Sequence, residues 1–292
     1  MTFTAELRAN RWLRLMRLDR PIGTYLLLWP TYWGLWFAAE GVPNINHLII
    51  FTLGVIVMRA AGCVINDYAD RKVDGAVRRT AHRPLPQGEI TPQQALMLFF
   101  VLLTVALGLV LMLNKLTVLF SIGGLLLAAS YPFLKRLTHL PQLGLGAAWA
   151  WTIPMAFVAE RQALPPALWL LFTAVILWTV AFDTYYAMVD RDDDVKVGIK
   201  SSAILFGRYD LAVIVSLQIA TLVLLSLVGI AFDRGLYYAL GLIIAAASFV
   251  KQYVKAKDRS EEGCFSAFLD NHRVGMIIFI GLAMDYQFTM AL

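Results

Sequence analysis

The chain has 292 residues, of which 59% are hydrophobic and only 15% are charged. Soluble domains typically contain about 25% charged residues and about 45–50% apolar ones, so this composition excludes an ordinary soluble protein. The formal net charge is +5. Because the basic residues follow a topological pattern, described below, this charge does not indicate nucleic-acid binding.

The N-terminal segment, residues 1–21, is basic. Its arginines recur at Arg8, Arg11, Arg14, Arg17 and Arg20, beside several large apolar residues. This pattern is typical of a helix lying on anionic lipid, and it is equally typical of a positively charged cytoplasmic anchor. The pattern of a cleavable signal peptide does not open the chain, so we expect no removed leader.

Apolar runs follow in blocks, and a run of about 20 such residues spans a hydrocarbon core roughly 30 Å thick. The sequence predicts nine spans, some of them short and therefore tilted or partly exposed. We expect them at residues 22–39, 47–65, 95–113, 116–131, 143–159, 168–188, 211–232, 236–250 and 274–292. Since the connections are mostly brief, the prediction is an all-α, polytopic membrane helix bundle that forms one domain over residues 1–292.

Most of the 25 basic residues fall in the N-terminal segment and in the even-numbered connections. On the opposite side lie only Lys115, Arg161 and Arg234, and Arg59 stands inside a span. Lys and Arg concentrate in cytoplasmic loops. We therefore expect a cytoplasmic N-terminus and, without an organellar targeting sequence, a bacterial inner membrane.

The two longest cytoplasmic connections follow the second and sixth predicted spans, and both begin with acidic runs. The first is Asn66-Asp67-x-x-Asp70-x-x-x-Asp74, and the second is Asp183-x-x-Tyr186-x-x-x-Asp190-x-x-x-Asp194. If each helix continues past the membrane surface, each set occupies one stripe about 100° wide. Each run ends the second helix of a group of four, which predicts two similar four-helix halves plus one further helix.

Stacked carboxylates repel each other, so both stripes require a cationic partner. Mg²⁺ prefers oxygen ligands and is usually bound by one or two carboxylates together with substrate phosphates. Interleaved basic residues supply contacts for phosphate oxygens; they are Arg71, Lys72, Arg78, Arg79, Arg83, Lys196, Lys200 and Arg208. The site therefore favours a polyanion bound through metal at a membrane surface, as in a lipid diphosphate.

Three charged residues lie within predicted spans, where ionisable groups are costly. Arg59 and Asp183 each lie about two turns before an acidic run, and they form either a structural ion pair or part of the site. Asp285 stands alone in the last span and is interpreted as a helix-packing or interface residue. The two cysteines, Cys63 and Cys264, have neither metal-site nor disulfide-framework spacing.

The first acidic run resembles the first Asp-rich motif of the UbiA superfamily of intramembrane aromatic prenyltransferases. The segment His82-Arg83-Pro84-Leu85-Pro86 with Gly88 is similar to the one that follows it in that family. The second run, followed by Gly198-Ile-Lys200-Ser201, resembles the second motif. The segments 18–23 and 28–31, and the run 183–190, resemble the 4-hydroxybenzoate polyprenyltransferase branch.

This resemblance implies Mg²⁺-dependent transfer of a polyprenyl group from a polyprenyl diphosphate to the carbon ortho to the hydroxyl of 4-hydroxybenzoate, in ubiquinone biosynthesis. Under it, Asp67, Asp70 and Asp74 bind one metal ion with Asn66 beside them, and Asp190 and Asp194 bind a second. Lys200 and Arg71 or Lys72 are the diphosphate candidates.

The remaining roles implied by the resemblance concern the acceptor and the carbocation. The candidates for binding the acceptor carboxylate are Arg20, Arg79 and Arg136, and the sequence does not rank them. Asp183 lies about two helical turns deeper in the membrane than Asp190. Tyr186 either stacks against the carbocation, bonds the phenol, or is an ordinary interfacial tyrosine.

Two alternatives remain open at this level. A sibling prenyltransferase would modify a naphthoate, homogentisate, haem or glycerol-phosphate lipid. A secondary transporter could also place acids at its cytoplasmic mouth, although transporters favour carboxylates near the bilayer midplane.

Overall fold

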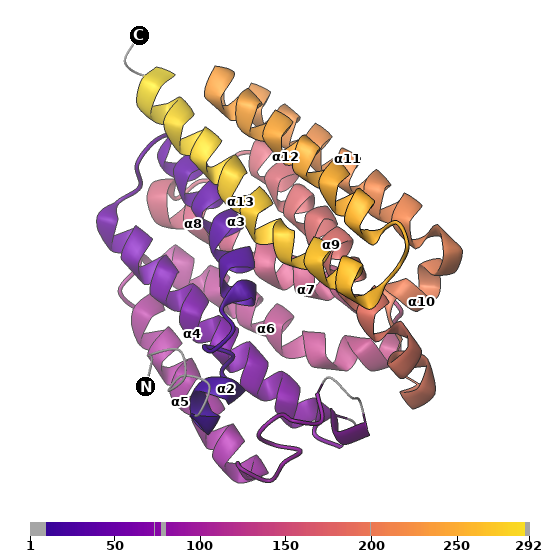
Figure 1. Cartoon of the computed structure of the whole chain (residues 1–292). Coiled ribbons are helices and arrows are strands. Elements are labelled where there is room, and N and C mark those ends of the chain that lie inside the picture. Colours follow the sequence, from indigo (N-terminus) through magenta and orange to yellow (C-terminus); the bar gives the residue numbers. More distant parts are fainter. Residues whose placement is uncertain (1–9, 73, 77–79, 199, 290–292) are drawn as a thin grey trace, which may run out of the picture.

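The computed structural model describes residues 10–72, 74–76, 80–198 and 200–289, and these parts contain helices and no strands (Figure 1). The long helices are α3 (Ile22–Ala39), α4 (Ile45–Asp70), α5 (Pro92–Val110), α6 (Lys115–Leu137), α9 (Ala167–Val197), α11 (Asp210–Ala231), α12 (Leu236–Ala256) and α13 (Glu261–Thr289). Shorter ones are α2 (Arg11–Leu15), α7 (Pro141–Ala150), α8 (Thr152–Arg161) and α10 (Ser202–Phe206). The all-α prediction is confirmed.

Seven helical stretches in the described residues are long and apolar enough to cross a membrane. They correspond to seven of the nine predicted spans. The two others are α3 and α6, which form at the predicted places but do not meet both criteria. Helix α3 is rich in Trp and Tyr, and the apolar part of α6 is the shorter stretch Lys115–Tyr131.

The predicted fifth span is a broken helix rather than a continuous one. Helices α7 and α8 meet at Trp151. Pro154 has no N–H to donate to the carbonyl of Ala150, four residues earlier, and its ring crowds the same turn. A proline at this place therefore separates the two short helices.

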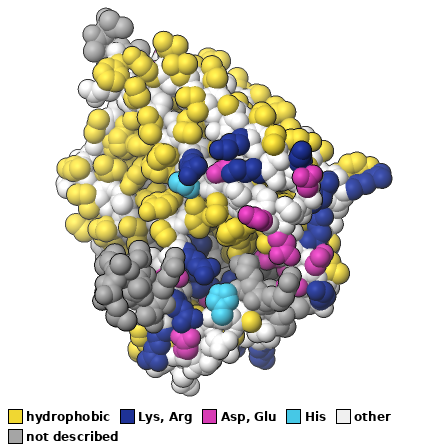
Figure 2. Space-filling model, viewed as in Figure 1, with side chains coloured by type: hydrophobic (Ala, Val, Ile, Leu, Met, Phe, Trp, Pro, Cys, Tyr) yellow, Lys and Arg dark blue, Asp and Glu magenta, His cyan; other side chains and the backbone are white. Residues whose placement is uncertain are grey.

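The helices form a bundle in which α13 packs against α12, α9 and α3, and so joins the end of the chain to its beginning. The largest apolar core lies in the C-terminal part, where Trp33 of α3 stacks on Trp178 of α9 with 5.3 Å between ring centroids. A smaller core joins Leu15 of α2 to Val64 of α4 and to Leu85 and Ile90. On the face seen in Figure 2, hydrophobic side chains dominate the upper left and charged ones gather toward the lower right.

The two acidic helices end at the same side of the bundle, at the lower right of Figure 1, which we call the acidic end. Helix α9 continues through Asp194 to Val197 and ends at Gly198, whose φ of 72° suits glycine. Helix α4 ends at Asp70, and Asp74 begins a separate 3₁₀ turn, Asp74–Ala76. The predicted continuous stripe is therefore correct for the second run and wrong for the first. Repulsion between stacked carboxylates and the low helix propensity of Gly75 oppose continuation of α4.

Candidate active site

One cavity of about 950 Å³ reaches from the acidic end into the bundle. Its wall includes side chains of α3, α4, α5, α6, α7, α8 and α9, together with residues of the segment 80–84. The inner part is mainly apolar, and the acidic end holds almost all of the charged groups. A cavity with an apolar body and convergent polar groups at one end is the usual form of a small-molecule site.

Most of the predicted site residues line this single cavity. Those on its wall are Arg20, Asn66, Asp67, Asp70, Asp74, Asp183, Tyr186, Asp190, Asp194 and Lys200. The two acidic runs, more than a hundred residues apart in the chain, therefore face the same space, as predicted from the sequence.

Four residues that were predicted to bind substrate are not among these wall residues. Arg71 turns back onto its own helix, where its guanidinium lies 4.1 Å from the ring centroid of Tyr68 and donates to the Tyr68 carbonyl. Lys72 is exposed and is not part of the cavity wall. Arg79 and the side chain of Arg136 lie outside the described residues.

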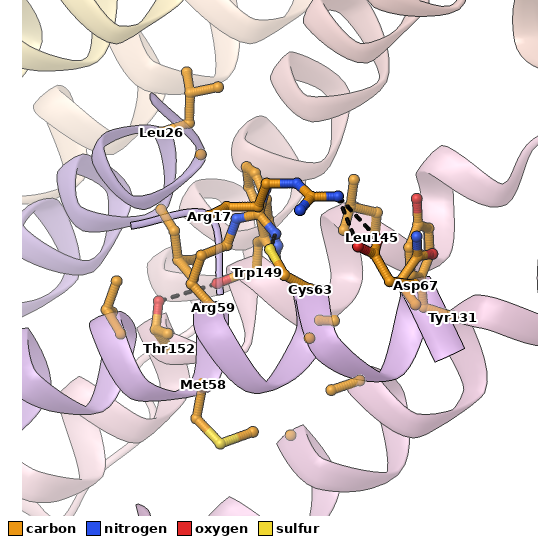
Figure 3. Close-up of a pocket in the computed structure, with 18 of the residues that line it drawn as sticks. Arg17, Leu26, Met58, Arg59, Cys63, Asp67, Tyr131, Leu145, Trp149 and Thr152 are labelled. Atoms are coloured by element: carbon orange, nitrogen blue, oxygen red, sulfur yellow. Dashed lines mark hydrogen bonds and ion pairs between the residues drawn. The ribbon is translucent and has the colours of Figure 1, made fainter. Parts of the chain in front are cut away.

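Asp67 is the centre of an ion-pair network. Its carboxylate is 1% exposed and accepts hydrogen bonds from Arg17 Nη2 at 2.8 and 3.0 Å and from Arg83 Nη1 at 2.9 Å. The same Arg83 Nη1 donates to Asp74 Oδ2 at 2.8 Å. Arg83 thus brings Asp74 beside Asp67 although the helix between them has ended. Figure 3 shows Arg17 reaching over the cavity to Asp67.

Arg17 was not predicted as a site residue. It follows α2 with a φ of 57°, an uncommon conformation for a residue with a side chain. Arg14, one turn earlier, pairs with Glu89 at 2.9 Å and donates to the His82 carbonyl at 2.8 Å. The N-terminal segment is therefore bound to the segment 80–90, and at least these two arginines make intramolecular contacts.

The second acidic run is held differently. Tyr186 packs its ring against Phe268 of α13, with 4.8 Å between centroids, and so lies against an aromatic wall of the cavity. Arg191, within the run, pairs with the fully buried Asp210 at the start of α11. Lys200 Nζ donates to the Leu137 carbonyl at 3.5 Å, and Lys200 lines the cavity.

Arg59 lies on the cavity wall, deeper than the acidic groups (Figure 3). Its guanidinium contacts Cys63 Sγ at 2.6 Å and lies 6.0 Å from the ring centroid of Trp149. Its Nε is buried and has no hydrogen-bond partner in the described part of the chain. Of the two interpretations left open, the structure places Arg59 at the site, and Asp183 lines the same cavity.

The prediction for Asp285 is confirmed. Its carboxylate accepts the Gly235 N–H at 2.9 Å and the Tyr238 N–H at 3.3 Å, at the start of α12, and lies 3.5 Å from Arg234. Asp285, which belongs to α13, therefore caps the N-terminus of α12. This contact lies at the end of the bundle far from the acidic groups.

The electrostatic environment differs between groups at the acidic end. Burial raises the pKa of Asp74 above its usual value, and Asp67 and Asp70 add to this rise while Arg83 opposes it. Burial, and then the charges of Arg20, Arg14, Arg83 and Arg17, lower the pKa of His82. Protonation of His82 is therefore less favourable than that of an isolated imidazole.

The donor set fits a hard divalent cation. The cavity wall carries carboxylate and amide oxygens from two helices, which are ligands that Mg²⁺ accepts. Among the described residues, no three acid, histidine or cysteine side chains are close enough to enclose an ion by themselves. Such a site suits Mg²⁺, which commonly shares its coordination between one or two carboxylates and substrate phosphates.

Comparison with known proteins finds similar chains in one family. Residues 27–280 match the UbiA prenyltransferase family. A 4-hydroxybenzoate octaprenyltransferase of Ectopseudomonas mendocina is 56% identical over 285 residues, which cover 97% of this chain and 96% of the relative. The protein of the same name from Pseudomonas aeruginosa is 56% identical over 284 residues, again covering 97% and 96%.

Solved structures support the same fold. The apo structure of a UbiA homolog from Aeropyrum pernix superimposes with a TM-score of 0.80 at 26% identity, covering 90% of this chain and 97% of that one. A UbiA homolog from Archaeoglobus fulgidus, bound to GPP and Mg²⁺, gives a TM-score of 0.75 at 19% identity, covering 95% and 99%.

Proposed function

The chain belongs to the UbiA prenyltransferase family, and from this premise we propose that it prenylates 4-hydroxybenzoate. The donor is a polyprenyl diphosphate, the new bond forms at the ring carbon ortho to the hydroxyl, and the product serves ubiquinone biosynthesis. The observation that carries the proposal is full-length identity of 56% to 4-hydroxybenzoate octaprenyltransferases, together with two acidic helix ends on one cavity.

We propose Mg²⁺ as the cofactor, held by Asp67, Asp70 and Asp74 with Asn66 beside them, and by Asp190 and Asp194 on the other wall. When bound, Mg²⁺ would supply positive charge to the oxygens of the departing diphosphate. Two solved structures of a UbiA homolog from Archaeoglobus fulgidus, one bound to GPP and Mg²⁺ and one bound to DMAPP and Mg²⁺, support this choice.

The arginines on Asp67 have a second role in this proposal. Arg17 and Arg83 neutralise Asp67 and Asp74. Guanidinium groups form bidentate, charge-assisted hydrogen bonds with phosphate oxygens as well as with carboxylates. We infer that Arg17 and Arg83, together with Lys200, would bind the diphosphate when Mg²⁺ is bound to Asp67 and Asp74. No buried charge would then be left unpaired.

For the acceptor carboxylate we propose Arg59 instead of the three arginines considered from the sequence. Arg20 also lines the cavity, but its side chain is 69% exposed. Arg59 offers a buried Nε without a hydrogen-bond partner in the described residues. It stands eight residues before Asp67 on α4, about 12 Å along the helix axis. The ring of 4-hydroxybenzoate would fit between them, with its hydroxyl toward the acidic end.

The prenyl tail requires an apolar path. The inner cavity wall includes Phe100 and Leu107 of α5 and Ile122 and Leu125 of α6. These same side chains are 61%, 53%, 53% and 42% exposed. We propose that the cavity opens to lipid along α5 and α6 and that the tail leaves there.

We propose nine membrane spans, with α3 and α6 added to the seven helical stretches that meet the length and composition criteria. The first four and the next four would form two similar halves, and α13 would be the additional helix. The basic residues favour a cytoplasmic N-terminus and acidic end, in a bacterial inner membrane. Residues 1–292 then form one domain, and residues 1–21 are its basic N-terminal cytoplasmic segment.

The test is prenyl transfer by purified protein given radiolabelled 4-hydroxybenzoate, a polyprenyl diphosphate and Mg²⁺. We expect a prenylated product that disappears with EDTA and in the variants Asp67→Ala and Asp190→Ala. Diphosphate release with a naphthoate or homogentisate acceptor only would assign the chain to a sibling activity. No diphosphate release with any acceptor would refute prenyl transfer.

A further inference from the structure

A buried carboxylate on the cavity wall has no role in the chemistry above. Asp19 lies between α2 and α3, lines the cavity, and has a side chain that is only 10% exposed. Its Oδ1 is buried and has no hydrogen-bond partner in the described residues. The ion partner described for it is Arg20, whose Nε lies 3.7 Å from Oδ2 and whose side chain is 69% exposed. Because so exposed an ion pair contributes little, it does not account for the burial of this carboxylate.

The backbone holds Asp19 in place without using its side chain. The Arg20 N–H donates to the Arg17 carbonyl at 3.2 Å and so closes a turn around Asp19. The carboxylate does not cap α3, because the capping position is Pro21 and no side chain makes a cap hydrogen bond there. Burying a carboxylate oxygen without a hydrogen bond is unfavourable, and a group of this kind calls for a functional explanation.

Asp19 lies beside the space proposed for the acceptor ring. Arg17, two residues before it, donates to Asp67 at the acidic end. Four residues after it, a Cβ on Gly23 would lie 2.4 Å from Nη2 of Arg59, so the guanidinium lies directly against Gly23. The chain between these two contacts therefore follows the cavity wall from the acidic end to Arg59, and Figure 3 shows both ends of this stretch.

We propose that Asp19 is the catalytic base that removes the ring proton after prenyl transfer. The inference rests on the proposed function, because it takes the acceptor ring as bound between Arg59 and the acidic end. A carboxylate beside the ring, rather than at either end of it, is placed to reach the carbon ortho to the hydroxyl.

The step balances as follows. The bond between the allylic carbon and the diphosphate breaks, and its electron pair leaves with the diphosphate. The ortho carbon forms the new carbon–carbon bond, so it carries both the prenyl group and its hydrogen while the ring is cationic. Asp19 takes that proton, and the electrons of the C–H bond restore the aromatic ring. The proton then passes from Asp19 to solvent water when the product leaves.

Charge favours Asp19 over the imidazole of His82, which lines the same cavity. Burial, and then the charges of four neighbouring arginines, lower the pKa of His82. A proton received by His82 would add a cation among those arginines, whereas a proton received by Asp19 removes a buried negative charge. The carboxylate also faces a ring that becomes positive during the reaction, so it stabilises that charge before it takes the proton.

The experiment compares 4-hydroxybenzoate with the same compound deuterated at both carbons ortho to the hydroxyl. Full-length protein in lipid nanodiscs receives a polyprenyl diphosphate and Mg²⁺, and kcat is measured from the prenylated product. In the wild type the proton is lost rapidly once the carbon–carbon bond has formed, so we expect no isotope effect on kcat. Because a general base typically contributes about 100-fold or more, Asp19→Asn should lower kcat by about 100-fold. It should also show a primary deuterium isotope effect, since proton removal becomes the slowest step.

Thermal unfolding supplies a second measurement. Asp19→Asn keeps the shape of the side chain and removes a buried charge, so its unfolding midpoint should not fall, as is common when a functional group is replaced. Asp285→Asn is the matched control, because Asp285 is a buried carboxylate that accepts two backbone N–H groups and pairs with Arg234. This control should have a lower midpoint and no isotope effect.

Asp19→Ser keeps the inference testable if Asp19→Asn does not fold, since it also lacks a basic carboxylate and should show the same isotope effect. Unchanged kcat, or a lower kcat without an isotope effect, in either folded variant would overturn the inference. An isotope effect in His82→Gln that is absent from Asp19→Asn would overturn it as well. Absence of prenyl transfer by the wild-type protein would instead refute the proposed function.

Discussion

The variant Gly23→Ala tests the proposed acceptor site without touching a charged group. A Cβ atom on Gly23 would lie 2.4 Å from Nη2, 2.5 Å from Nε and 2.8 Å from Cζ of Arg59. Non-bonded heavy atoms prefer separations of about 3.5–4.0 Å. The guanidinium must therefore move by on the order of 1 Å, and because it ends a flexible side chain, the backbone of α3 can stay in place.

We expect the variant to weaken the binding of 4-hydroxybenzoate and not that of the polyprenyl diphosphate. A hydrogen bond to a charged group contributes about 1.5–3 kcal/mol. Loss of one of the two bonds from Arg59 to a carboxylate thus corresponds to a rise of about tenfold or more in the KM for 4-hydroxybenzoate. The KM for the polyprenyl diphosphate should change little, since that ligand is proposed to bind at the acidic end. Steady-state kinetics with each substrate varied in turn measures both values.

Two further variants sharpen this test. Gly108→Ala is the matched control, because a Cβ at this α5 position meets nothing within 4 Å. It should leave both KM values unchanged. In an Arg59→Met background, Gly23→Ala should add almost nothing, because both changes act on the same contact. Equal rises in both KM values, or full additivity with Arg59→Met, would refute the assignment of Arg59.

Three other outcomes are expected from the structure. Arg83→Gln leaves Asp67 and Asp74 sharing a buried site with Arg17 alone. In metal-free buffer this variant should destabilise the fold by about 3 kcal/mol, measured as a lower thermal unfolding midpoint. An unchanged midpoint would contradict a structural role for the ion-pair network. Mg²⁺ with inorganic diphosphate at about 100 times its Kd should stabilise the wild-type protein by about 2.7 kcal/mol, and EDTA should remove this gain in a thermal-shift assay. Trp178→Ala removes an indole that is 1% exposed and hydrogen-bonded to Asn271 at 2.9 Å; the expected loss is about 3–5 kcal/mol, with 4-hydroxybenzoate KM unchanged in the protein that remains folded.

Local patterns in the sequence predicted the helices and the two acidic runs, because apolar length and helical spacing are properties of neighbouring residues. The break at Trp151 follows from Pro154 and could have been anticipated, since proline interrupts helices. Helix α4 ends before Asp74, which spacing alone could not reveal.

The missed parts of the site depend on contacts between distant segments. Arg17 reaches Asp67 across fifty residues, and its unusual backbone conformation has no signature in a run of regularly spaced arginines. The role of Arg59 depends on Gly23 and Trp149, which belong to two other helices. Spacing along one helix carries no information about such partners.

Helix α5 packs mainly against α4, touches α6 at few positions, and has only 6% of its most apolar stretch buried. If the prenyl tail leaves along α5 and α6 as proposed, acyl chains would bound one side of the reaction chamber together with protein. The thickness and order of the surrounding lipid would then set the environment of the distal isoprene units, while the protein would fix the diphosphate end. A long donor would react at its head with its tail still in the hydrocarbon phase, and the membrane rather than a closed protein wall would constrain donor length.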